Sequence, residues 1–303
     1  MCRMITIIGG LTIDENIFRG RIRKCIGGPG YYISRILNNI GVKHVLISIV
    51  GRDFPRDEIC NSEYTICRII RLECENIYFK NIYIDEDTRI QECTYPGYEI
   101  DPDALLMYLN IIIDGGIIII SPVIGEFPLS IVSRLSANNR VLLDPQGYVR
   151  YIDGRRVNHK YIGWEGFKDV YLIKPSIEEF KYLFRDLSDL ELFLDSTYAI
   201  LSVTLGIDGS IYISRDECYY IPPYRPLKGV DPTGSGDVFM GGLAYAMYND
   251  YKGLDMALFS TVLAYSFLAG EETNLDEISF RMDELRNRIR EYELRDIYKI
   301  YLS

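Results

Sequence analysis

Imidazole and paired thiols are scarce in this chain. It has two histidines, His44 and His159, and its seven cysteines form no C-x-x-C pair. Zinc sites and triads of serine, histidine and aspartate depend on these groups, so we expect neither. Only two glutamines occur in 303 residues, whereas there are 25 tyrosines and abundant charged residues. This composition is typical of proteins from thermophiles.

Positive charge and long apolar segments are also lacking. The 33 Lys and Arg residues are outnumbered by 43 Asp and Glu, which gives a net charge of −10 and argues against nucleic acid or anionic membrane as a partner. Apolar runs such as 117–120 and 261–269 are too short to span a bilayer, and the start of the chain runs directly into a predicted strand. We expect a cytoplasmic protein that binds any phosphate at a local site and not through an extended basic surface.

Three cysteines, Cys60, Cys67 and Cys74, are spaced by seven residues. This spacing could place them on one face of a helix. We expect buried free thiols instead, and the sequence leaves the redox state of the cysteines open.

Apolar strands alternate with helical patterns along most of the chain, which predicts a parallel sheet with helices on both faces. We expect a single domain over residues 1–303. The predicted strands are 4–9, 45–50, 117–120, 141–143, 170–173 and 199–203, and the predicted helices are 31–41, 129–135, 177–184, 238–247, 254–269 and 278–289.

Two segments interrupt this α/β rhythm. Residues 77–84 and 89–95 alternate apolar and polar side chains around Asp85-Glu86-Asp87, which predicts an antiparallel hairpin with one wet face. This hairpin could cover a binding site, and the alternative is an ordinary hairpin at the edge of a sheet.

The stretch Asp231-Pro232-Thr233-Gly234-Ser235-Gly236-Asp237 opens onto a helical run. The first N–H groups of a helix lack internal partners, and small residues let an anion approach them. Asp237 would repel such an anion unless it takes a proton, for instance from a substrate hydroxyl. A plain glycine-rich turn with acidic residues at a helix start is the alternative.

This stretch resembles the Asp-Thr-x-Gly-Ala-Gly-Asp signature of the PfkB, or ribokinase-like, carbohydrate kinases, with Ser235 in place of alanine. The resemblance implies a ribokinase-like α/β/α sandwich and a small β lid formed by about 15–26 and 77–96. It further implies that Asp237 is the catalytic base and that Gly234, Ser235 and Gly236 form the anion hole. ATP and Mg²⁺ are the implied cofactors, and a monovalent cation is left open.

Other segments are similar to further motifs of this family. Gly27-Gly28 before a helix resembles the glycines that approach the sugar, with Pro29 as a departure, and Asp14 matches the acidic residue that binds hydroxyls. Thr204-Leu205-Gly206-Ile207-Asp208-Gly209 resembles the segment that borders ATP. Lys174-Pro175-Ser176-Ile177-Glu178-Glu179 resembles a Lys-Pro-Asn-x-x-Glu motif tied to magnesium, so Lys174 is expected near the nucleotide and Glu179 near the metal, through water.

The loop Asp144-Pro145-Gln146-Gly147-Tyr148-Val149-Arg150 bears on the substrate. An amide near a guanidinium can pair with adjacent ring hydroxyls, so Gln146 and Arg150 are substrate candidates. With Ser121-Pro122-Val123 and the Tyr31-Tyr32 pair, this loop resembles the archaeal myo-inositol 3-kinase branch of the family. These residues could equally be ordinary loop residues.

We therefore expect an ATP-dependent kinase acting on a hydroxyl of a sugar or cyclic polyol, first of all myo-inositol. Nucleoside and hexose kinases of the same fold are rivals, because the phosphate machinery does not identify the acceptor. A non-catalytic nucleotide-binding regulator is a rival of another class, and a metal-independent hydrolase is disfavoured. The sequence leaves a homodimer open.

Overall fold

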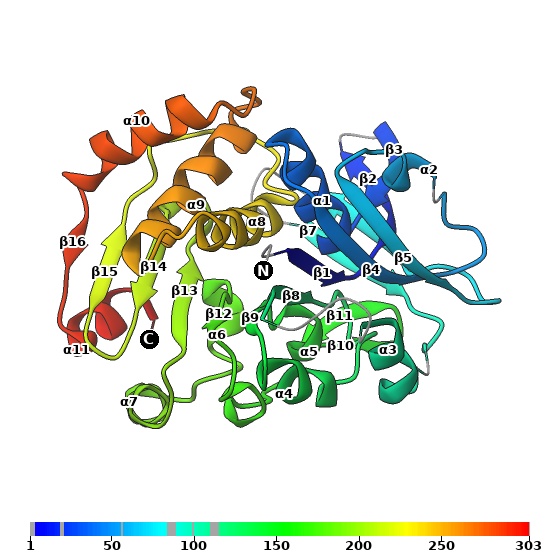
Figure 1. Ribbon diagram of the computed structural model, residues 1–303, viewed down its shortest axis with the longest axis horizontal. Coiled ribbons are helices and arrows are strands. Elements are labelled where there is room, and N and C mark those ends of the chain that lie inside the picture. The colour runs from blue at the N-terminus through cyan, green and yellow to red at the C-terminus, as the bar shows by residue number, and fades with distance from the viewer. Residues whose placement is uncertain are drawn as a thin grey trace.

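The computed structural model describes residues 4–18, 21–55, 57–83, 89–98, 100–109 and 115–302. Figure 1 shows one large sheet with helices on both faces and a second sheet at one end. The predicted turn Asp85-Glu86-Asp87 lies outside the described residues. Among the described helices, none is both long and apolar enough to cross a membrane.

The large sheet has the strand order β16-β15-β14-β13-β12-β9-β8-β1-β4-β5. Its strands from β13 to β5 are parallel, and β14, β15 and β16 are antiparallel additions at one edge. The α/β prediction of a mostly parallel sheet is therefore confirmed. The bounds are β1 Ile5–Gly9, β4 His44–Val50, β5 Thr65–Arg71, β8 Ile117–Ser121, β9 Arg140–Leu143, β12 Leu172–Ile173, β13 Ile200–Thr204, β14 Ser210–Ile213, β15 Cys218–Ile221 and β16 Arg290–Glu291.

Both faces of this sheet are buried, which explains the continuous apolar strands. Along β8, Ile117 and Ile119 belong to one hydrophobic cluster, whereas Ile118 and Ile120 belong to the other. One face is covered by α1 Pro29–Asn39, α8 Ser235–Tyr248, α9 Leu254–Leu268 and α10 Leu275–Arg286 (Figure 1). The other is covered by α3 Pro102–Leu109, α4 Ser130–Ser136, α5 Gln146–Val149, α6 Ile177–Phe180, α7 Leu187–Ser196 and α11 Leu294–Ile297.

The second sheet has the order β10-β11-β7-β6-β2-β3. The predicted hairpin is present in it as the antiparallel pair β6 Tyr78–Tyr83 and β7 Arg89–Thr94. The sheet also contains β2 Thr12–Phe18, β3 Arg21–Gly27, β10 Arg150–Asp153 and β11 Arg156–His159. The hairpin of β10 and β11 was not predicted, since four-residue strands leave almost no periodicity to detect.

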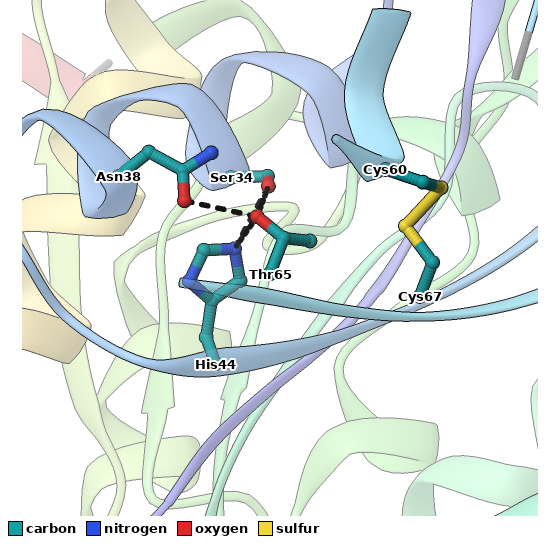
Figure 2. Close-up of a disulfide and its surroundings, with 6 residues drawn as sticks. All are labelled: Ser34, Asn38, His44, Cys60, Thr65 and Cys67. Carbon is teal, nitrogen blue, oxygen red and sulfur yellow. Dashed lines mark hydrogen bonds between the residues drawn. A yellow bond between two sulfur atoms is a disulfide. The ribbon is translucent and has the colours of Figure 1, made fainter. Parts of the chain in front are cut away.

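The expectation of free thiols at Cys60 and Cys67 is wrong. They form a disulfide with a Cα–Cα distance of 5.8 Å, which joins α2, Asp57–Cys60, to β5 (Figure 2). The seven-residue spacing does not reflect a helix face, because the chain turns between the two cysteines and Cys67 lies on a strand. Cys74 is free, as expected, and half-buried.

A buried polar network near this disulfide holds α1 against β4 and β5 (Figure 2). The Nδ1 atom of His44 lies 2.9 Å from the carbonyl oxygen of Val42, which can only accept, so Nδ1 carries the proton. Nε2 then accepts from the hydroxyl of Ser34 at 2.8 Å. Burial lowers the pKa of His44, which keeps the ring neutral and makes it a packing residue rather than a catalytic one.

Candidate active site

A cavity of about 820 Å³ lies between the carboxyl ends of the parallel strands, the N-terminus of α8 and the inner face of the second sheet. Parallel strands end at one edge of a sheet, so loops distant in the chain meet there. Thirteen of the residues predicted for the site line this cavity: Asp14, Gly28, Gln146, Arg150, Lys174, Glu179, Thr204, Gly206, Gly209, Gly234, Ser235, Gly236 and Asp237.

Gly27 is the predicted residue that is not among the cavity lining. It ends β3 beside Asp14, and a Cβ atom there would lie 2.1 Å from Asp14 Oδ2. The absence of a side chain at Gly27 therefore makes room for the carboxylate.

Gly234 caps the N-terminus of α8 in the left-handed region, at φ +82°. A Cβ atom at this position would lie 2.5 Å from the ring of Tyr32, so both the backbone conformation and the available space require glycine. Tyr32 itself lines the cavity.

The N–H groups at the start of α8 differ from the expectation in one respect. The N–H of Ser235 donates to the carbonyl oxygen of Pro232 at 3.1 Å, so it is already used within the loop. Within the described residues, the N–H groups of Gly236 and Asp237 have no acceptor. These two groups are therefore the ones available to a bound anion.

Asp237 lies in the first turn of α8 and is half-buried at the cavity. Burial raises the pKa of its carboxyl group to about 7, with Lys174 and Arg150 opposing the rise and Asp144 and Glu179 adding to it. A carboxylate with this pKa can accept a proton near neutral pH and release it again, as a general base must.

Lys174 and Asp144 form a buried ion pair beneath the glycine loop, with 2.6 Å between Nζ and Oδ2. Burial alone would lower the pKa of Lys174, but Asp144, Glu179 and Asp237 together raise it, so the side chain stays charged. Its Nζ also donates to the carbonyl oxygen of Gly236 at 3.4 Å. The sequence analysis placed both residues just after predicted strands, but it did not predict the ion pair. The pair forms because β9 and β12 are neighbours in the sheet, so their ends lie side by side.

Ser176 and Glu179 form a capping box at the start of α6. The N–H of Ser176 donates to Glu179 Oε2 at 2.8 Å, and the N–H of Glu179 donates to Ser176 Oγ at 3.2 Å. Serine caps a helix as asparagine does, so this departure from the family motif keeps Glu179 in place. Burial raises the pKa of Glu179, with Asp144 adding to the effect.

Among the described residues, no group of three or more His, Cys, Asp or Glu side chains could hold a metal ion by itself. Magnesium usually keeps several waters and substrate oxygens in its coordination sphere, so one buried carboxylate such as Glu179 is a fitting protein contribution.

The opposite wall carries the predicted acceptor residues. Asp14 lies within β2, and its carboxylate accepts from Thr12 Oγ1 at 2.6 Å. Gly28, at φ +86°, approaches the backbone of Gly10, where a Cβ atom would lie 2.5 Å from the carbonyl oxygen. Gln146 opens α5 and Arg150 opens β10, so both enter the cavity from short elements and not from a loop.

The far end of the cavity carries Thr204, Gly206 and Gly209. Gly209 has φ +98°, and a Cβ atom there would lie 2.2 Å from the carbonyl oxygen of Ile221, which explains this glycine. The sequence interpretation missed several residues that complete this wall or the opposite one, for which it had no motif: Phe79, Asn81, Gln91, His159, Pro223, Arg225, Leu227 and Tyr265.

Comparisons with known proteins agree with the family resemblance. A model of the pfkB family of carbohydrate kinases matches residues 165–272. The inositol 3-kinase of Arabidopsis thaliana is 27% identical over 277 residues, which cover 86% of this chain and 72% of the relative. The cytidine kinase of Thermococcus kodakarensis is 26% identical over 252 residues, which cover 78% of this chain and 86% of the relative.

A solved structure has the same fold. It is a pyrophosphate-dependent kinase of the ribokinase family, complexed with a pyrophosphate analogue and myo-inositol. It superimposes with a TM-score of 0.72 at 18% identity, covering 94% of this chain and 100% of that one. The predicted ribokinase-like fold is thereby confirmed.

Proposed function

We propose that the chain, a phosphotransferase of the PfkB family of carbohydrate kinases, transfers the terminal phosphate of ATP to a hydroxyl of a cyclic polyol or sugar. Myo-inositol is the first candidate acceptor. One observation carries this proposal: the half-buried Asp237, whose pKa burial raises to about 7, adjoins two available N–H groups in the cavity that also holds Asp14, Gln146 and Arg150.

In the proposed reaction, Asp237 removes the proton from the acceptor hydroxyl as the hydroxyl oxygen attacks the terminal phosphorus. The bond from that phosphorus to the bridging oxygen breaks, and ADP leaves. The N–H groups of Gly236 and Asp237 stabilise the charge that develops on the transferring phosphoryl group. Asp14, Gln146 and Arg150 orient the acceptor ring, and Thr204, Gly206 and Gly209 border the nucleotide. When bound, Mg²⁺ supplies charge neutralisation at the donor phosphates, and Glu179 is the residue that would hold it, through water.

We treat residues 1–303 as one domain in which the second sheet serves as the lid. Closure of a lid over the acceptor matters because water competes with the hydroxyl for the phosphoryl group. The inner face of the second sheet already contributes Asp14, Phe79 and Asn81 to the cavity, which supports this role.

Myo-inositol as acceptor draws support from two comparisons, the Arabidopsis inositol 3-kinase and the ribokinase-family structure with bound myo-inositol. A nucleoside kinase is the second candidate. The aromatic rings of Tyr32 and Phe79 line the acceptor end of the cavity, where they could stack on a base, and one relative is a cytidine kinase.

The test is a donor and acceptor panel with the purified protein. ATP and pyrophosphate are each paired with myo-inositol, ribose, a hexose and cytidine, and the products are measured by ³¹P NMR, with Asp237→Asn as the control. We expect ATP and myo-inositol to give the highest kcat/KM. Turnover of cytidine alone would favour the second candidate, and no phosphorylated product from any pair would contradict kinase activity.

A further inference from the structure

Three amide side chains form a row across the second sheet. Asn16 on β2 pairs with Asn81 on β6, and Asn81 pairs with Gln91 on β7, so the three occupy directly opposite positions on adjacent strands. Gln91 Nε2 donates to Asn81 Oδ1 at 2.9 Å, and Asn81 Nδ2 donates to Asn16 Oδ1 at 2.8 Å. Asn16 Nδ2 completes the row by donating to the thiol of Cys25 at 3.6 Å.

This amide row lies on the cavity face of the sheet. Asn81 and Gln91 line the cavity, together with Asp14 and Phe79, which precede Asn16 and Asn81 by two positions on the same strands. Successive residues of a strand point to opposite faces. The intervening residues Glu15 and Lys80 pair with each other on the outer face, with 3.8 Å between Nζ and Oε1.

An inward-facing row of amides stabilises a small sheet less readily than apolar side chains would. Apolar side chains at Asn81 and Gln91 would pack without needing partners, whereas a buried amide destabilises the fold unless it is hydrogen-bonded. Asn81 is only 3% exposed. Asn81, in the middle of the row, both donates and accepts a hydrogen bond within it, whereas Gln91 at one end lines the cavity. This arrangement is expected where a ligand completes the hydrogen-bond network.

The direction of the hydrogen bonds defines what that outside group is. Along the row each amide donates through its nitrogen and accepts through its oxygen, so the oxygen of the last member, Gln91 Oε1, is the acceptor that the row itself does not use. The carboxylate of Asp14 on the same wall is also an acceptor. This wall therefore suits a ligand that donates hydrogen bonds and carries no negative charge.

We propose that the amide row of Asn16, Asn81 and Gln91 is a specificity element for the acceptor, in which Gln91 receives a hydrogen bond from a ring hydroxyl other than the one phosphorylated. The ligand class is an uncharged polyhydroxylated ring. This inference rests on the proposed function. Gln91 and Gln146, the two glutamines of the chain, both line the cavity, so two amide side chains are available to the same ring.

The experiment measures KM and kcat for myo-inositol and each monodeoxy-inositol, with the wild type, Gln91→Met and Asn81→Leu. Asn158→Leu is the matched control, because Asn158 lies on β11 between the cavity residues Val157 and His159 and so points to the other face. If Gln91→Met does not fold, Gln91→Asn replaces it, because asparagine keeps the amide group on a side chain that is one methylene shorter.

For the wild type we expect one monodeoxy-inositol to have a KM about tenfold above that of myo-inositol, because a site built for a hydroxyl rejects the analogue without it. In Gln91→Met this difference should disappear, with the KM of myo-inositol itself raised about tenfold and kcat nearly unchanged. Asn81→Leu should show the same loss of discrimination, because Gln91 loses the partner that orients it. Asn158→Leu should behave as the wild type.

If the wild type phosphorylates myo-inositol but Gln91→Met keeps the same discrimination, the inference is overturned and the proposed function stands. An equal loss of activity toward every analogue would also overturn it, because that indicates a structural role alone. A wild type that phosphorylates no polyol or sugar would overturn the proposed function itself, and the inference with it.

Discussion

The ammonium group of Lys174 lies 2.6 Å from the carboxylate of Asp144, and both side chains are buried at the ends of neighbouring parallel strands. The pair joins the two halves of the cavity. Asp144 accepts from the N–H of Gln146 at 3.0 Å, and Lys174 donates to the carbonyl oxygen of Gly236 at the start of α8. A single charge pair therefore connects the proposed substrate and phosphate residues.

Replacing Lys174 by Met should leave the carboxylate of Asp144 buried without compensation and should destabilise the protein by about 3–5 kcal/mol. The charge of Lys174 also holds the pKa of Asp237 down, so its loss should move the acid limb of the pH–rate profile to higher pH. Urea unfolding and the pH dependence of kcat/KM measure the two effects. The double variant Lys174→Met/Asp144→Asn should regain stability, and failure to do so would contradict the buried pair as the cause.

Activity should rise with pH through about 7, because Asp237, the proposed base, can accept a proton only when it is ionised, and burial raises its pKa to about 7. Asp237→Asn should lower kcat by roughly a hundredfold or more while ATP binding changes little. Turnover and nucleotide binding by calorimetry measure these effects. Near-normal turnover in Asp237→Asn would remove this residue from the mechanism.

The same residue should lower stability at alkaline pH. Because the folded-state pKa of Asp237 lies above its ordinary value of 3.8, folding favours the protonated form, and this contribution is lost as pH rises through about 7. Asp237→Asn should therefore unfold at a higher temperature than the wild type at pH 8, and the difference should shrink at pH 5.5. Thermal denaturation at both values checks the sign, and a constant difference would contradict it.

Gly234→Ala should destabilise the protein by more than backbone strain alone, because its Cβ atom would lie 2.5 Å from the ring of Tyr32. Gly270→Ala is the matched control. Gly270 has φ +69°, and no atom lies within 4 Å of the position that a Cβ atom would take. Gly270→Ala should therefore lower the free energy of unfolding only through its left-handed backbone, by about 1–2 kcal/mol. Equal losses of unfolding free energy in the two variants would show that the contact with Tyr32 does not matter.

Removal of the disulfide by Cys60→Ser/Cys67→Ser should lower the free energy of unfolding by about 2 kcal/mol, since the bond closes a short loop. Catalysis should be unaffected, because neither cysteine lines the cavity. Denaturation with and without reductant measures the first effect. Alkylation of Cys60 or Cys67 in the native, unreduced protein would show that the bond is absent.

Much of the architecture was predictable from the sequence. Strands buried on both faces need continuous apolar residues, so runs such as 117–120 identified the large sheet without knowledge of their neighbours. The start of α8 after the glycine loop was also predictable, because small residues before an apolar pattern of helical spacing are a local signal for a helix start. The predicted helix 31–41 began two residues early, at Pro29, whose fixed φ suits a first helical position.

Tertiary structure alone decided the contacts between segments that are distant in the chain. The pairing of Asp144 with Lys174, the row from Asn16 through Asn81 to Gln91 and the addition of β10 and β11 to the second sheet all depend on which strands become neighbours. Periodicity within one segment carries no information on that choice, because strand order follows from how the layers pack around two cores. The amino-acid sequence by itself thus specified the elements and the glycine loop before α8, whereas packing determined the charges and amides that surround the cavity.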